Sequence, residues 1–210
     1  PLSSQTQRAH SAMNLANKLT LTRILLAVLF LLMLLSGLPG GTTAALVTFI
    51  IASLTDYFDG HIARSRNMIT NFGKLMDPLA DKIMVSSAFI AFVGLHWIPS
   101  WIAVAIIGRE FAVTGLRNLA ASQGKVVPAD GFGKAKTVSQ IVAIITILVG
   151  YAIQMDLMEG LGCCLWLGVL FPTPFQWITW ILLAVALVLT LYSGANYIRQ
   201  NWNIIFEKGC

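Results

Sequence analysis

The sequence contains six apolar stretches, each about 20 residues long, and these constrain the fold more than any other feature. They cover residues 21–38, 43–63, 78–97, 100–121, 133–154 and 175–197. A helix rising about 1.5 Å per residue needs roughly 20 residues to cross the hydrocarbon of a bilayer. Transmembrane β-strands are alternating segments of about 10 residues, a pattern the sequence does not show. The sequence therefore predicts an all-α integral membrane protein with six transmembrane helices.

The composition agrees with this prediction. Hydrophobic residues make up 57% of the chain and charged residues 11%, whereas a soluble domain is about 25% charged. So few charges exclude a soluble globule and a disordered chain. The three cysteines include the adjacent pair Cys163 and Cys164, which indicates packing roles and no disulfide framework.

The basic residues predict the orientation in the membrane. All 14 Lys and Arg residues except Arg109 fall at alternate loops and at the two ends. They are Arg8, Lys18, Arg23, Arg64, Arg66, Lys74, Lys82, Arg117, Lys125, Lys134, Lys136, Arg199 and Lys208. The positive-inside rule then places both termini in the cytoplasm, and we expect a bacterial inner membrane. A one-sided basic face suits membrane lipids and phosphorylated substrates. No basic domain stands clear of the membrane, so we expect no nucleic acid partner.

The regions outside the spans carry separate expectations. Residues 1–12 resemble a leader segment, with Met13 as a natural start, and residues 13–210 are expected to form one membrane-embedded domain. Arg23 followed by the apolar residues 24–35 also resembles a signal peptide, which is the alternative interpretation of the first stretch. We expect residues 156–174 to form an interfacial or re-entrant loop.

Four aspartates lie where charge is costly, near the ends of two neighbouring spans. Asp56 and Asp59 are spaced i, i+3 near the end of the second stretch, and Asp77 and Asp81 are spaced i, i+4 at the start of the third. Each pair therefore occupies one helix face, and a short loop over residues 65–76 would bring the pairs together. Four close carboxylates stay ionised only beside cations, and their hard oxygens favour Mg²⁺, Mn²⁺ or Ca²⁺. The alternative is a salt-bridge network with the nearby basic residues.

The wider spacing favours the metal site over the salt-bridge network. The run is Asp56-x2-Asp59-Gly60-x2-Ala63-Arg64-x8-Gly73-x3-Asp77-x3-Asp81. It resembles, at all eight specified positions, the signature of the CDP-alcohol phosphatidyltransferase family. The resemblance implies a six-helix membrane enzyme, usually a homodimer. It also implies a divalent-metal reaction in which an alcohol displaces CMP from a CDP-linked lipid or alcohol.

The resemblance also implies roles for individual residues. Asp56, Asp59, Asp77 and Asp81 would hold two Mg²⁺ or Mn²⁺ ions, and Asp81 would also be the catalytic base for the attacking hydroxyl. Arg64 can add a bidentate phosphate contact. The expected CDP-lipid pocket further includes Asp56, Gly60, Ala63, Thr70 and Gly73. For Thr70, simple loop capping is the alternative.

Two further stretches concern the acceptor alcohol. Residues 13–23 resemble the Asn-Leu-Pro-Asn-x-Leu-Thr-x-x-Arg opening of the family branch that uses glycerol 3-phosphate, with Ala16 in place of the usual Pro. This opening predicts a short N-terminal interfacial helix. Asn17 and Thr20 are candidate contacts to the CDP part, with helix capping as the alternative.

The second stretch runs from the fourth span into the fifth and is similar to the same branch. Arg109 and Glu110 lie deep in an apolar span, so they either pair with each other and their neighbours or face a watery cavity. Arg109, Arg117, Lys134 and Lys136 are expected to form a pocket for the phosphate of the acceptor. For the lysines, membrane-surface anchoring is the alternative. These residues imply transfer from CDP-diacylglycerol to glycerol 3-phosphate, giving phosphatidylglycerol phosphate and CMP in phospholipid biosynthesis.

Two other functions remain open from the sequence. The same chemistry with another acceptor, inositol phosphate or serine, would use the same aspartates, although the basic cluster disfavours a neutral acceptor. A cation transporter would also need acids in its spans. Transport requires a path across the whole membrane, and here the four aspartates gather toward one face.

Overall fold

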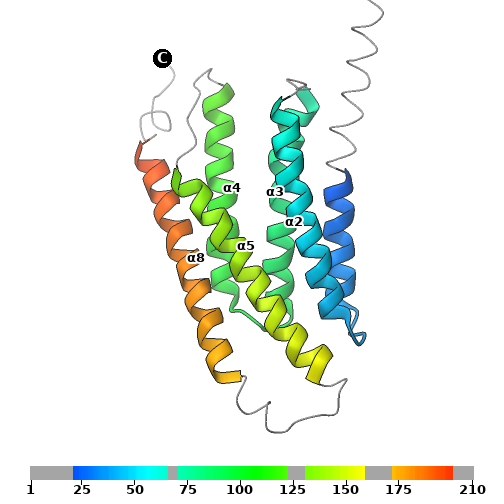
Figure 1. Cartoon of the computed structure of the whole chain (residues 1–210). Helices are drawn as coiled ribbons and strands as arrows, with labels where there is room; N and C mark the ends of the chain where they lie inside the picture. The colour runs from blue at the N-terminus through cyan, green and yellow to red at the C-terminus, as the bar shows by residue number, and fades with distance from the viewer. Residues whose placement is uncertain (1–20, 66–70, 123–130, 159–171, 201–210) are drawn as a thin grey trace, which may run out of the picture. The chain divides into compact units, whose positions relative to one another are not determined.

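The computed structural model describes residues 21–65, 71–122, 131–158 and 172–200, and it describes the side chains of these ranges outside residues 56–81 and a few helix ends. Every regular element in these ranges is helical, and they contain no strand (Figure 1). The helices are Leu21–Leu35, α2 (Gly41–Ser65), α3 (Asn71–Gly94), α4 (Ser100–Ser122), α5 (Gly131–Ala152), the π-helix η1 (Ile153–Met158) and α8 (Pro172–Gln200). The all-α prediction is confirmed. The expected N-terminal interfacial helix lies outside the described residues.

Two helical segments are long and apolar enough to cross a membrane, Ala135–Asp156 and Phe175–Gln200. Only 39% and 28% of their apolar windows are buried within the protein, so most of this surface faces outward. In α8, Trp177, Ile181 and Val188 are 60–70% exposed. Leu21–Leu35, Gly41–Thr55 and Lys82–Gly94 are shorter apolar helices. The count of six spans stays a prediction.

The start of α3 corrects one expectation. The sequence predicts a loop over 65–76 and a span that begins at Pro78, where the apolar stretch starts. The structure begins α3 at Asn71, so Pro78 lies inside the helix. Its missing N–H removes one backbone hydrogen bond, a loss that apolar helices tolerate when their neighbours compensate. Asp77 and Asp81 consequently lie in the second and third turns of α3 and not in its first turn.

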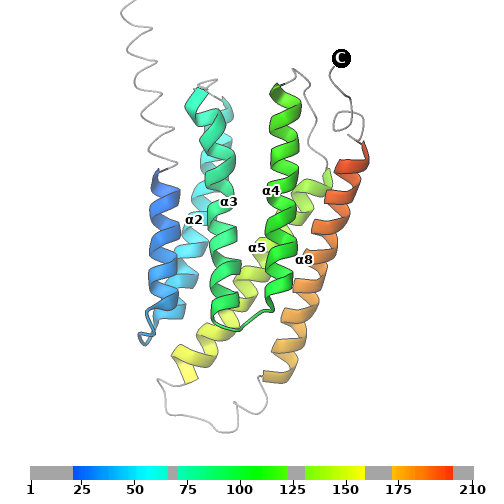
Figure 2. The same ribbon diagram turned by 180° about the vertical axis from the view of Figure 1, so that it is seen from behind.

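The helices form two compact units, of which the first contains residues 1–91 and 148–163. Helix Leu21–Leu35 runs antiparallel to α2 (Figures 1 and 2). Phe30 and Phe49 are fully buried between them, with ring centroids 5.7 Å apart. The intervening turn contains Gly37 and Gly40 at φ of 64° and 81°, a left-handed conformation that favours glycine. This turn lets α2 reverse direction immediately and pack against the preceding helix.

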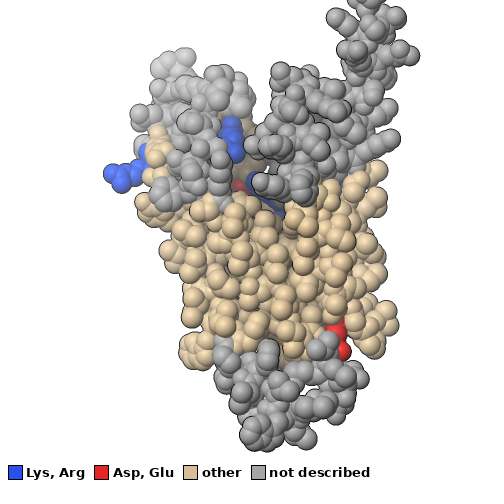
Figure 3. Space-filling model, in the orientation of Figure 1, with Lys and Arg blue, Asp and Glu red and all other residues tan. Residues whose placement is uncertain are grey.

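The second unit contains residues 92–147 and 164–210. Helices α4 and α8 run in the same direction and contact each other, while α5 runs oppositely (Figures 1 and 2). The apolar core of this second unit includes Ile106, Ile144 and Leu183, each almost completely buried. In the view of Figure 3 the described surface consists mainly of residues other than Lys, Arg, Asp and Glu. The charged side chains discussed below are therefore exceptions within an apolar surrounding.

Candidate functional site

The four aspartates of the predicted metal site belong to two helices of the first unit. Asp56 and Asp59 lie in the last three turns of α2, and Asp77 and Asp81 lie in the first three turns of α3. Because both segments are helical, the spacings i, i+3 and i, i+4 give each pair one helix face, as predicted. Only residues 66–70 separate the two helices. The aspartate side chains themselves lie outside the described side chains, so their convergence stays a prediction.

The donor set can be compared with the expected metal on chemical grounds. Four carboxylates on two helical faces offer the hard oxygen ligands that Mg²⁺ and Mn²⁺ prefer, and the helical backbone allows the pairing. Among the side chains that the structure describes, no group of three or more His, Cys, Asp and Glu is placed to hold a metal ion.

Of the other residues expected to contact the CDP-lipid, the structure describes the backbone of some and does not describe the rest. Gly60, Ala63 and Arg64 follow the first aspartate pair on α2, and Gly73 precedes the second pair on α3. Their side-chain surroundings are not described. Asn17, Thr20 and Thr70 lie outside the described residues. All of these assignments remain predictions.

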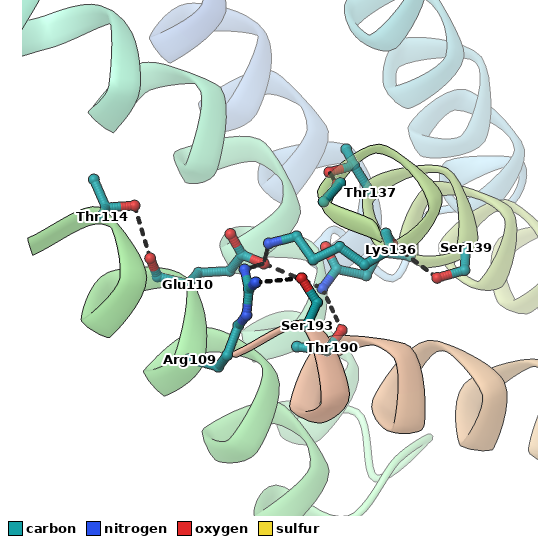
Figure 4. Close-up of polar contacts among 10 residues, drawn as sticks. Arg109, Glu110, Thr114, Lys136, Thr137, Ser139, Thr190 and Ser193 are labelled. Carbon is teal, nitrogen blue, oxygen red and sulfur yellow. Dashed lines mark hydrogen bonds and ion pairs between the residues drawn. The ribbon is translucent and has the colours of Figure 1, made fainter. Parts of the chain in front are cut away.

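The expected acceptor cations lie in the second unit, and two of them meet at one acid. Glu110 of α4 is buried, with 9% of its surface exposed. Its Oε1 accepts a hydrogen bond from Nζ of Lys136 on α5, which is 5% exposed (Figure 4). Nη1 of Arg109 lies 3.6 Å from the same oxygen. Of the two possibilities for Arg109 and Glu110, the structure shows pairing with each other and with a neighbour.

Polar residues that the sequence did not single out complete this network (Figure 4). Gln140 of α5 donates from Nε2 to Thr190 Oγ1 of α8 at 3.0 Å and approaches Glu110 Oε1 at 3.4 Å. Ser193 of α8 accepts a hydrogen bond from Arg109 Nη2 at 2.8 Å. Gln140, Thr190 and Ser193 are each at most 2% exposed. In the sequence, each of these three is a polar residue within an apolar stretch, and this pattern is the signal that could have indicated them.

The remaining predicted acceptor cations differ from this pair. Arg117 is exposed at its side of α4, and its guanidinium carbon lies 5.9 Å from the ring centroid of Tyr197 on α8. This is the geometry of a cation–π contact. The side chain of Lys134 is not described, although its position in the first turn of α5 is. The structure therefore brings Arg109 and Lys136 together and places Arg117 on the ring of Tyr197.

A second acid bridges elements of the first unit. Asp156, in η1, accepts hydrogen bonds from the backbone N–H of Gly40 at 3.1 Å and of Thr43 at 2.6 Å. It also accepts one from the Thr43 hydroxyl at 2.7 Å. These donors are at the start of α2, where the first N–H groups of a helix lack partners within the helix. We had placed Asp156 in a loop, and the structure shows it as the N-terminal cap of another helix.

Comparison with known proteins now adds the class. The family model for CDP-alcohol phosphatidyltransferase matches residues 13–192. The chain therefore belongs to the CDP-alcohol phosphatidyltransferase family, a class of transferase enzymes. Members of this family generally depend on a divalent metal ion. The match includes both aspartate helices and, from the buried network, Arg109, Glu110, Lys136, Gln140 and Thr190.

Individual relatives cover most of the chain. The CDP-diacylglycerol--glycerol-3-phosphate 3-phosphatidyltransferase of Bacillus subtilis is 38% identical over 208 residues, 91% of this chain and 97% of the relative. A probable phosphatidylglycerophosphate synthase of Mycobacterium tuberculosis is 37% identical over 190 residues, which are 89% of this chain and 81% of the relative. A CDP-diacylglycerol--glycerol-3-phosphate 3-phosphatidyltransferase of Arabidopsis thaliana is 30% identical, over 99% of this chain and 88% of the relative. With the two long apolar helices, the bacterial relatives indicate a membrane protein.

Proposed function

We propose that this chain transfers the phosphatidyl group of CDP-diacylglycerol to glycerol 3-phosphate, giving phosphatidylglycerol phosphate and CMP. The names of relatives that cover most of the chain support this substrate pair. The observation that carries the proposal is the buried network of Arg109, Lys136 and Glu110. It brings two cations to one buried carboxylate, where α4 and α5 meet.

The acceptor phosphate is the anion that we assign to this region. An apolar surrounding strengthens the attraction of buried cations for a phosphate. Arg109 and Lys136 supply the buried cations, and Arg117 and Lys134 add charge from α4 and α5. An arginine offers a phosphate two parallel N–H donors, and a lysine adds a compact charge.

The aspartates of α2 and α3 carry the chemistry of the other substrate. Asp56, Asp59, Asp77 and Asp81 would hold two Mg²⁺ or Mn²⁺ ions, which when bound neutralise the diphosphate and stabilise the charge on departing CMP. Asp81 accepts the proton of the attacking hydroxyl. The hydroxyl oxygen of glycerol 3-phosphate bonds to the phosphatidyl phosphorus, and the bond from that phosphorus to CMP breaks. The CDP part is bound by Arg64 together with Asn17, Thr20, Gly60, Ala63, Thr70 and Gly73.

The proposed setting follows from the apolar helices and the basic loops. Six transmembrane helices in residues 13–210 would place both termini and the site at the cytoplasmic face of a bacterial inner membrane. Lipid substrate would reach the site sideways from the bilayer. We expect a homodimer, as the family resemblance implies.

An acceptor panel tests the proposed function. The purified full chain is given CDP-diacylglycerol, Mg²⁺ or Mn²⁺, and one radiolabelled acceptor at a time: glycerol 3-phosphate, inositol phosphate or serine. We expect label in lipid with glycerol 3-phosphate, one CMP released per lipid formed, and loss of both on chelation by EDTA. Label from inositol phosphate or serine alone would overturn the acceptor assignment. Cation flux in sealed vesicles without CMP release would overturn the enzyme.

The base is tested by the substitution Asp81→Asn. This variant should release no CMP while it still binds CDP-diacylglycerol, because the amide cannot accept the proton. Turnover within tenfold of the wild type would remove the base assignment. Loss of CDP-lipid binding would make Asp81 mainly a metal ligand.

A further inference from the structure

The side chain of Arg109 packs closely against α8 at Gly194. A Cβ built on Gly194 would lie 2.8 Å from Cγ of Arg109 and 3.1 Å from its Nε. Real Cβ contacts are essentially never that short, so any larger residue at 194 forces the arginine side chain to move. Gly194 is buried and has an ordinary helical backbone. Its missing side chain therefore provides the space in which Arg109 lies.

The same face of α8 also holds the guanidinium in place. Ser193, next to Gly194, accepts the 2.8 Å hydrogen bond from Nη2 of Arg109, while Nη1 faces Glu110 at 3.6 Å. The Arg109 side chain is 10% exposed, and its Nε has no hydrogen-bond partner among the described residues. A buried N–H without a partner costs free energy. The position of Arg109 is thus imposed by α8 at a cost to the packed helices.

A second set of contacts runs from α8 to the other cation. Thr190 lies four residues before Gly194 and three before Ser193, on the same helix face. It accepts the hydrogen bond of Gln140 at 3.0 Å, and Gln140 reaches Glu110, which accepts the hydrogen bond of Lys136. Figure 4 shows the side chains of α4, α5 and α8 converging on this region. Both cations are therefore oriented through α8.

We infer that Thr190, Ser193 and Gly194 of α8, acting with Gln140, form a positioning surface that sets Arg109 and Lys136 for the phosphate of the acceptor. These four residues act through the cations and do not themselves bind the substrate. The inference rests on the proposed function, because it assigns the partner of the two cations. The geometry that supports it is the close approach of Gly194 to Arg109 and the two hydrogen bonds accepted by Ser193 and Thr190.

The test compares glycine substitutions at two places in the full-length protein. Gly194→Ala should raise the KM for glycerol 3-phosphate about tenfold or more, because a misplacement of ~1 Å in a binding group can cost roughly a hundredfold. The KM for CDP-diacylglycerol should stay within about twofold. Gly115→Ala on α4 is the matched control, since a Cβ there meets no described atom within 4 Å. It should leave both KM values as in the wild type.

A second pair of variants separates positioning from packing. Thr190→Val removes the hydroxyl with little change of shape and should raise the same KM about fivefold, the usual effect of one neutral hydrogen bond. Thr190→Ser restores the hydroxyl and should restore the KM. Glycerol 3-phosphate binding, measured by titration calorimetry, should weaken in parallel. If Gly194→Ala fails to fold, Ser193→Ala takes its place with a smaller expected rise.

The outcomes distinguish the two levels of the account. Wild-type KM values for glycerol 3-phosphate in Ser193→Ala and Thr190→Val would overturn the positioning surface and leave the proposed function standing. Equal rises in both KM values would also overturn it, because they indicate a general packing defect. If the wild-type protein transfers nothing to glycerol 3-phosphate, the proposed function fails, and the inference fails with it.

Discussion

Two carboxylates connect distant helices in this protein, and they do so in different ways. Glu110 in the second unit is contacted by Lys136, Arg109 and Gln140, so its partners are side chains and two of them are charged. Asp156 in the first unit is contacted by the backbone of Gly40 and by Thr43, which are neutral donors. Glu110 reaches the next helix along the chain, 26 and 30 residues away, whereas Asp156 reaches residues 116 and 113 positions away. The two acids also differ in whether their described partners are charged.

The difference bears on the roles that we propose, structural for Asp156 and substrate binding for the network around Glu110. Asp156 satisfies N–H groups at the start of α2, and a negative charge there interacts favourably with the helix dipole. Glu110 instead meets two buried cations, the residues to which we assign the acceptor phosphate. Acids of similar chemistry can thus be sorted by their partners.

The largest expected effect follows from removing the buried lysine. Lys136→Met should lower kcat/KM for glycerol 3-phosphate more than about a hundredfold and reduce the free energy of unfolding by up to ~3–5 kcal/mol, because it breaks a buried pair. Steady-state kinetics measure the change in kcat/KM, and thermal unfolding in detergent measures the change in stability. Lys136→Arg keeps the charge and should recover part of the activity. Activity within threefold of wild type in Lys136→Met would remove Lys136 from the acceptor site.

The substitution of the other acid should give an intermediate effect of a different kind. Asp156→Ala removes the cap of α2 and should lower the free energy of unfolding by about 0.5–2 kcal/mol, the usual range for an N-cap. Asp156→Asn keeps one oxygen acceptor and should lose less. The KM for glycerol 3-phosphate should not change in either variant. A raised KM with unchanged stability would reverse the roles assigned to Asp156 and Glu110.

The smallest expected effect concerns the exposed arginine. Tyr197→Leu removes the ring beneath Arg117 and should cost about 0.5–1 kcal/mol for the cation–π contact, in addition to the packing lost at the buried ring. Tyr197→Phe keeps the ring and serves as the control. The KM for glycerol 3-phosphate should rise about twofold in the first variant only. Identical kinetics in both would show that the ring does not orient Arg117 for the acceptor.

The helices could be predicted from the sequence because apolar length alone demands them. The prediction of 100–121 compares with α4 at Ser100–Ser122, and 43–63 with α2 at Gly41–Ser65. The start of α3 could not be predicted in this way. Residues 71–77 are helical but not predominantly apolar, so the apolar stretch from residue 78 shows only where the helix is apolar and not where it begins. The π-helix after Ala152 also has no period that the apolar pattern reveals.

The site was predictable to different degrees in its two parts. The spacing of the aspartates along α2 and α3 follows from helical register, which the sequence contains. The contacts of Arg109 with Ser193 and of Gln140 with Thr190 join residues at least 50 positions apart. Such contacts depend on how α4, α5 and α8 pack, which a local pattern does not encode. The role of Gly194 follows from the Arg109 side chain that packs against it, and the sequence alone does not show this contact.

The most direct test of the central claim is diffraction from crystals of the full-length protein soaked in Mn²⁺ and measured for its anomalous signal. We expect anomalous density between Asp56, Asp59, Asp77 and Asp81, with all four carboxylates directed toward it. Loss of that density in Asp77→Ala crystals would assign the ligands. Aspartates that face apart, with no ion between α2 and α3 at saturating Mn²⁺, would contradict the proposed enzyme.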